Sequence, residues 1–193
     1  MHHTEVLRQR LPDEYKDVRL NLSTVLAGVS SLSEAQRWGT AVAAAAATRQ
    51  SELYRAISAD AAAQVDAKVL EDARAAAALM AMNNVYYRFR HLVEKPSYGE
   101  KRAGLRMNRI GQPATSKLDF ELFSLAVSAL NGCGVCMQSH ERAVVAGGLT
   151  EDQVLDAVRI AAVMSSAAQA LVLLDPVPGT HPADLSAGAK AQS

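Results

Sequence analysis

Apolar residues recur along most of the chain at the three- and four-residue spacing of an amphipathic helix. Leu11, Tyr15, Val18 and Leu22 form one such stripe, which predicts helix over residues 5–27 with a break near Pro12. No segment shows the strict alternation typical of a half-buried strand. The pattern therefore predicts an all-α fold, with further helices over residues 34–48, 51–62, 66–93, 117–130, 133–147 and 151–173.

Polar residues at the ends of these segments support the predicted boundaries. Ser33 with Gln36, and Thr150 with Gln153, have the spacing of a capping box. Ser116 is placed to cap the helix that starts near Lys117. A helix break is expected at 131–132, where the sequence is Asn-Gly.

Residues 95–115 form the one long irregular stretch, with Pro96, Gly99, Gly104, Gly111 and Pro113. The plain interpretation is a solvated loop, and the functional alternative is a flap near the active site or a subunit contact. Residues 176–193, rich in Ala, Gly, Ser and Pro, are expected to form a flexible C-terminal tail. We therefore expect one helical domain over residues 1–175.

The second half of the long 66–93 segment carries Met82, Tyr86 and Phe89 at helical spacing, which we interpret as core or interface packing in preference to a ligand box. A short internal similarity relates residues 81–84 to residues 129–132 at an offset of 48 positions. The similarity indicates a duplicated helical unit in which only the second copy kept thiols.

Composition narrows the choice further. Of the 193 residues, 49% are apolar, with alanine the most common, and 5% are aromatic, which favours close helix packing over a β-sandwich. Basic and acidic residues number 20 each, so nothing points to nucleic acid or an anionic membrane surface. No apolar run approaches the length of a membrane span, and the N-terminus lacks a secretory pattern. We therefore expect a cytoplasmic protein, whose zero net charge does little to oppose self-association.

The chemistry concentrates in residues 131–141, which contain both cysteines of the chain, Cys133 and Cys136, followed by His140. Two cysteines three positions apart can form a disulfide or bind a metal. A structural zinc site would need a fourth ligand, and no second CxxC or histidine cluster supplies one. A pair of inert buried thiols remains an alternative. Met137 stands where a c-type haem motif needs histidine.

A thiol at a helix N-terminus has a lowered pKa, and a partner cysteine one turn away can condense with it after oxidation. His140 lies one turn after Cys136 on the same predicted face and can exchange protons with it. Glu121 lies in an apolar stretch and needs a partner, which His140 provides if the two helices pack together. A solvated Glu121 and a purely structural His140 are the alternatives.

The stretch from Phe120 to Glu141 resembles the alkyl hydroperoxidase D (AhpD) family of the carboxymuconolactone decarboxylase-like superfamily. The resemblance covers most of residues 15–173 and is carried upstream by the segments 20–23, 38–40, 45–49, 80–88 and 104–108. It implies an all-helical subunit that assembles as a homotrimer. It also implies an antioxidant thiol peroxidase that reduces alkyl hydroperoxides and needs no tightly bound cofactor or metal.

The resemblance further implies a role for each residue and a set of partners. Cys136 matches the cysteine that becomes a sulfenic acid, Cys133 matches the resolving cysteine, and His140 with Glu121 matches the proton relay. The external electron donor is a dihydrolipoyl group on a lipoyl-bearing acyltransferase. The family can also re-reduce a partner peroxiredoxin, alkyl hydroperoxide reductase C.

One position departs from the pattern of the family. Val135 stands where better-known members carry a second histidine before the second cysteine, which makes the mouth of the site more apolar and the relay more dependent on His140. Two other functions stay open. One is an electron-transfer adaptor for a peroxiredoxin with little peroxidase activity. The other is a decarboxylase-like enzyme of the superfamily, against which the intact CxxC argues.

Overall fold

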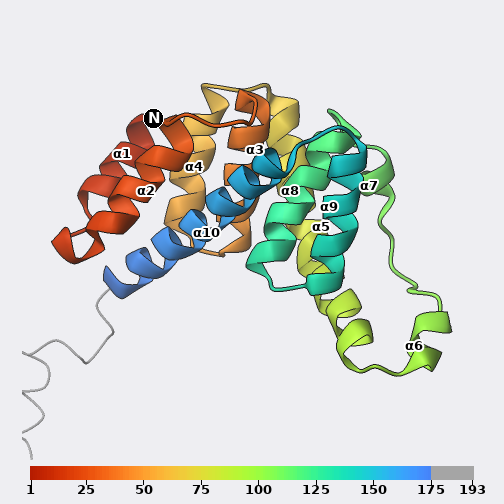
Figure 1. Cartoon of the computed structure of the whole chain (residues 1–193). Helices are drawn as coiled ribbons and strands as arrows, with labels where there is room; N and C mark the ends of the chain where they lie inside the picture. Colours follow the sequence, from red (N-terminus) through yellow and green to blue (C-terminus); the bar gives the residue numbers. More distant parts are fainter. Residues whose placement is uncertain (175–193) are drawn as a thin grey trace, which may run out of the picture.

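The computed structural model describes residues 1–174, which form helices joined by short connections and contain no strand (Figure 1). The all-α prediction is therefore confirmed for these residues, while the expected tail lies outside them. The elements are α1 (His2–Gln9), η1 (Asp13–Tyr15), α2 (Lys16–Ala27), α3 (Glu34–Ala47), α4 (Ser51–Ala62), α5 (Ala67–Leu92), α6 (Pro96–Glu100), α7 (Asn108–Gly111), α8 (Lys117–Leu130), α9 (Gly134–Ala146) and α10 (Glu151–Leu174).

The predicted caps explain where the helices begin. Ser33 Oγ accepts the Gln36 backbone N–H at 3.2 Å while Gln36 Oε1 accepts the Ser33 N–H at 3.1 Å, so the capping box is complete. Ser116 Oγ accepts the Asp119 N–H at 3.0 Å at the start of α8. These side chains satisfy N–H groups that have no partner within the helix, and the predicted boundaries are confirmed.

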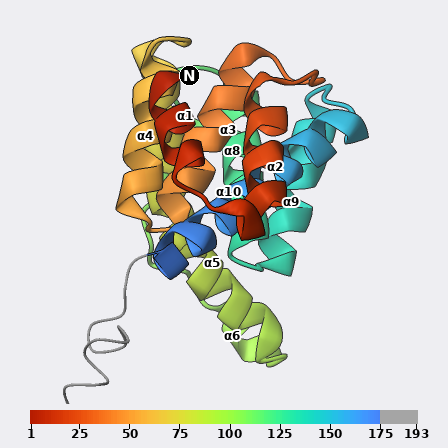
Figure 2. The same cartoon turned by 90° about the vertical axis from the view of Figure 1, so that its left-hand side faces the viewer.

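Helix α3 lies at the centre and packs against α4, α5, α8 and α10 (Figure 2). The side chains of Ala41 to Ala45 are fully buried, as expected if small residues let neighbouring helices approach closely. Gly39 shows the closeness of this packing, because a Cβ added there would lie 2.1 Å from Cζ of Phe123 on α8. Helix α8, which leads into the cysteine loop, is therefore held against the centre of the fold.

Helix α10 corrects one expectation from the sequence. By length and composition it is apolar enough to cross a membrane, although no such run was predicted. In the structure it packs against α2, α3 and α8, and Ile160, Met164 and Leu171 are buried there. Its contacts in the structure are those of a core helix.

The C-terminal end of α5 and the short α6 project away from the other helices in both views (Figures 1 and 2). Phe89 is 50% exposed, and Val85 and Leu92 are exposed too. Met82 and Tyr86 are half-buried within one chain while Phe89 is exposed, so Phe89 is not a core residue of the single chain, and the interface part of the packing prediction stays a prediction. Periodicity identifies an apolar face, but it does not say whether the same chain covers it.

The segment 95–115 contains α6 and α7 where only irregular structure was expected. Pro96 occupies the first turn of α6, where a backbone N–H would have no acceptor within the helix, so the missing N–H of proline costs nothing there. The end of the segment is fixed to α5 by Asp72, whose carboxylate accepts bonds from Ala114 N at 2.9 Å, Thr115 N at 2.7 Å and Arg109 Nη2 at 2.8 Å. The duplication of a helical unit stays a prediction.

Candidate dithiol site

The cysteine loop lies between α8 and α9. Helix α8 ends at Leu130, and Gly132 adopts a φ of 67°, a conformation that favours glycine and reverses the chain. Cys133 is the N-cap of α9, so Cys136 lies in the first turn, where backbone N–H groups are free to face a negative charge. The two cysteines form a disulfide, and Cys133 is fully buried while Cys136 is 7% exposed.

His140 lies one turn after Cys136 on the buried side of α9. Its Nδ1 is 2.6 Å from Oε2 of Glu121 on α8, so the contact expected from the sequence is present. Both side chains are nearly buried, with exposed fractions of 11% and 12%. The carboxylate fixes the orientation of the imidazole through Nδ1, which leaves Nε2 as the nitrogen available for a reacting group.

A polar network holds the loop against α5. Asn84 Nδ2 donates to Ser128 Oγ at 2.9 Å, and Asn131 Nδ2 donates to Asn84 Oδ1 at 2.9 Å. Arg88 Nη1 donates to the Asn131 carbonyl oxygen at 2.6 Å, at the C-terminal end of α8. Cys133 N donates to the Ser128 carbonyl oxygen at 3.0 Å. Asn84 is buried, so these bonds fix the position of the loop that carries Cys133.

A cavity of about 330 Å³ opens beside the Glu121–His140 pair. Val135 forms part of its wall, so the residue that departs from the family pattern is in contact with this space. Met107 and Ile110 contribute to the wall as well, which places the end of the 95–115 segment at the candidate site. The remaining lining residues are Asn83, Tyr87, Ser139 and Ala143.

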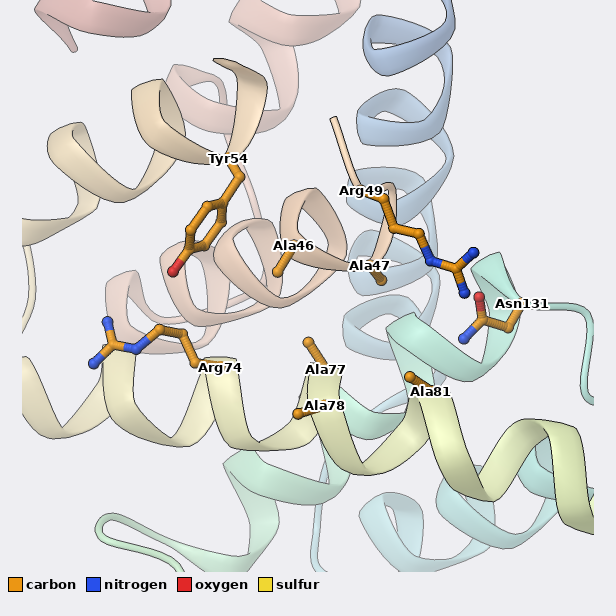
Figure 3. A pocket seen from close by; sticks show the side chains of 9 residues that line it. All are labelled: Ala46, Ala47, Arg49, Tyr54, Arg74, Ala77, Ala78, Ala81 and Asn131. Atoms are coloured by element: carbon orange, nitrogen blue, oxygen red, sulfur yellow. The ribbon is translucent and has the colours of Figure 1, made fainter. Parts of the chain in front are cut away.

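A second concavity, of about 350 Å³, lies among α3, α4 and α5 (Figure 3). Alanines from α3 and α5 form its floor, with Arg49 and Asn131 towards one end of the view and Tyr54 and Arg74 towards the other. It shares only Asn131 with the cysteine loop and includes neither His140 nor Glu121. His140 and Glu121 therefore line the first cavity, and Val135, the neighbour of Cys136 in the chain, forms part of its wall.

The arrangement of donor groups bears on the metal alternative. Within residues 1–174, no three His, Cys, Asp or Glu side chains gather in a way that could hold a metal ion. Cys133 and Cys136 are bonded to each other, and His140 is directed to Glu121. The residues around the pair are thus arranged for proton transfer next to a dithiol or disulfide.

An all-helical chain with a buried CxxC disulfide and an adjacent carboxylate–histidine pair defines a class of helical dithiol proteins. Residues 96–177 match the carboxymuconolactone decarboxylase family. A protein of Anaeromyxobacter dehalogenans (strain 2CP-C) named alkyl hydroperoxide reductase AhpD is 63% identical over 88% of this chain and 90% of its own length. Proteins of the same name from Rhodospirillum centenum (52% identical, 86% and 89% covered) and Streptomyces griseus (48%, 83% and 90%) are also similar. The chain belongs to the AhpD family.

The sequence interpretation missed the residues that surround the four candidates. Asn84, Asn131 and Arg88 support the loop, and Asn83 lines the cavity. The available signal was a pair of asparagines in the middle of an alanine-rich helix, because such residues disfavour a helix interior unless they have a local reason to be there.

Proposed function

We propose that this protein is an antioxidant thiol peroxidase that reduces alkyl hydroperoxides through a dithiol/disulfide cycle. The observation that carries the proposal is the 2.6 Å contact between His140 and Glu121 beside the Cys133–Cys136 disulfide at the start of α9. The names of the AhpD relatives support the same reaction. The catalytic residues proposed are Cys136, Cys133, His140 and Glu121.

In the first step, the Cys136 thiolate attacks the terminal oxygen of the hydroperoxide. An S–O bond forms, the O–O bond breaks, and the alkoxide leaves as an alcohol with a proton from His140. Cys136 is then a sulfenic acid. The position of Cys136 in the first turn of α9 supports this role, because the free N–H groups and the helix dipole favour a thiolate there.

In the second step, the Cys133 sulfur attacks the sulfur of the sulfenic acid. The S–S bond forms, the S–O bond breaks, and water leaves with the proton of the Cys133 thiol. An external dithiol then restores the site by two thiol–disulfide exchanges and becomes a cyclic disulfide itself. The sum is one hydroperoxide and one dithiol converted to an alcohol, water and one disulfide.

The external dithiol in this proposal is a dihydrolipoyl group on an acyltransferase, and no tightly bound cofactor is required. The reduced pair also passes electrons to the disulfide of a partner peroxiredoxin. A cytoplasmic location suits the cycle, because reducing pathways there regenerate thiols.

We also propose a homotrimer. Exposed apolar residues on the projecting end of α5, including Val85, Phe89 and Leu92, support a subunit contact there. Light scattering on a Phe89→Glu variant tests this: a trimeric parent and a smaller variant support the contact, and an unchanged mass contradicts it.

Cysteine variants test the cycle. Hydroperoxide consumption with dihydrolipoamide is expected in the parent and lost in Cys136→Ser. Without any added dithiol, reduced Cys133→Ser consumes about one equivalent and stops at a sulfenic acid that has no resolving thiol, whereas the reduced parent stops at the disulfide. A Cys136→Ser variant as fast as the parent contradicts the proposal. If the parent consumes hydroperoxide only when the peroxiredoxin is added, the protein is an electron-transfer adaptor.

A further inference from the structure

Asn83 is a buried polar residue that the reaction scheme does not use. It lies on α5, is 5% exposed, and its amide oxygen has no hydrogen-bond partner among residues 1–174. The neighbouring Asn84 has a buried amide too, but its oxygen and nitrogen both bond within the loop network. A buried carbonyl oxygen without a partner lowers the stability of the fold, so its presence needs a reason.

The surroundings of Asn83 provide one. The residue lines the cavity that also contains Glu121 and His140. The walls next to this amide are largely apolar, from Tyr87, Met107, Ile110, Val135 and Ala143. An apolar cavity with a few convergent polar groups is the usual form of a site for a small organic molecule.

We propose that Asn83 binds the hydroperoxide group of the substrate in this cavity. The claim rests on the peroxidase function proposed above. The amide oxygen accepts the O–H of the hydroperoxide, and the apolar walls contact its organic group. An amide can also rotate to present its N–H₂ to a peroxide oxygen, so either end satisfies the ligand. No bond to Asn83 forms or breaks in the reaction, and its role is to hold the hydroperoxide group beside His140 and next to Val135, which precedes Cys136 in the first turn of α9.

The cavity also indicates the substrate class. Its volume of about 330 Å³ suits a compact alkyl or aryl hydroperoxide. Hydrogen peroxide has the same O–H donor but no organic group to bury, and burial of apolar groups favours binding. The reduced protein should therefore prefer cumene hydroperoxide to hydrogen peroxide by at least tenfold, roughly, in kcat/KM.

The test is an Asn83→Leu variant, with Asn108→Leu as a matched control because Asn108 is exposed at the start of α7. In a cycle of two half-reactions, kcat/KM for each substrate reports only its own half. For Asn83→Leu, kcat/KM for cumene hydroperoxide should fall roughly tenfold, while kcat/KM for dihydrolipoamide stays within about twofold. The melting temperature should not fall, because leucine replaces an unpartnered polar group by an apolar one of similar size.

Each result decides the question. The selective loss in the hydroperoxide half-reaction supports the assignment, as does the same loss in Asn83→Ala should the leucine variant not fold. Equal losses in both half-reactions show a structural role, and a loss confined to dihydrolipoamide shows that the cavity takes the donor; both overturn the proposal. A parent that uses hydrogen peroxide as well as cumene hydroperoxide overturns the substrate class. A parent inactive with every hydroperoxide overturns the peroxidase function itself.

Discussion

The two faces of helix α5 line concavities of similar volume and opposite chemistry. Ala78 belongs to the pocket of Figure 3, and Tyr87 belongs to the cavity beside His140. The two residues are nine positions apart, about two and a half turns, so they lie on opposite sides of the helix. The pocket of Figure 3 has a floor of alanines with exposed arginines around it. The cavity beside His140 has larger apolar walls and a nearly buried carboxylate–histidine pair.

This difference shows that size and shape alone do not identify the reactive site. Both concavities can admit a small molecule, but only the cavity beside His140 combines a histidine–carboxylate pair with a buried amide oxygen that has no hydrogen-bond partner among residues 1–174. Buried polar groups cost free energy unless they are paired, so their concentration on one face of α5 points to function there. On the alanine side, Ala73, Ala76 and Ala77 are buried and α5 packs against α3, whereas Ala78 and Ala81 are exposed.

Among the predicted variants, the largest loss of activity is expected when His140 is replaced. His140→Ala should lower kcat/KM for hydroperoxide about 100-fold or more, because general acid–base catalysis by a positioned imidazole contributes about 10²–10⁴-fold. His91→Ala is the matched control, since His91 is exposed at the end of α5, and its activity should stay within about twofold of the parent. Steady-state assays with dihydrolipoamide measure both. If His140→Ala kept most of its activity, the assignment of the reactive face would be wrong.

The next largest effect, on stability, is expected at Asp72, which anchors the segment that supplies Met107 and Ile110 to the wall of the same cavity. Asp72 is fully buried, and removing its carboxylate leaves the N–H groups of Ala114 and Thr115 without their acceptor. Asp72→Ala should therefore lower the free energy of unfolding by about 3 kcal/mol. Glu71→Ala removes the other, exposed carboxylate on Arg109 and should cost less than about 0.5 kcal/mol. Urea denaturation compares them, and equal costs would rule out Asp72 as the anchor.

The same carboxylate gives a dependence on pH. Burial raises the pKa of Asp72, but hydrogen bonds from Ala114, Thr115 and Arg109 outweigh it and hold the pKa below its ordinary value of 3.8. The stability it contributes is thus present above pH 3.8 and is lost as the pH falls through the lower folded-state value. The difference in melting temperature between the parent and Asp72→Asn should be largest near neutral pH and shrink below about pH 4. A gap that stayed constant with pH would contradict the mechanism.

Local features were predictable and distant ones were not. The Ser33–Gln36 cap follows from a spacing of three residues, and the His140–Glu121 contact follows from two neighbouring helices and a carboxylate in apolar surroundings. The anchoring of residues 107–115 by Asp72 joins positions about 40 apart, and no periodicity encodes such a contact. The place of Asn83 at the candidate site could not be predicted for a related reason, because the cavity that it lines is formed by four helices.

The smallest effect is expected on the alanine face. Arg49 and Arg74 are exposed, so salt at physiological strength screens their charges beyond about 8 Å. The double change of both to alanine should leave kcat/KM for hydroperoxide within about twofold. Arg88→Ala provides the comparison, because it removes the bond to the Asn131 carbonyl and loosens the cysteine loop, for a loss of roughly tenfold. Larger losses in the double variant than in Arg88→Ala would place part of the reactive site in the pocket of Figure 3 and break the distinction between the two faces of α5.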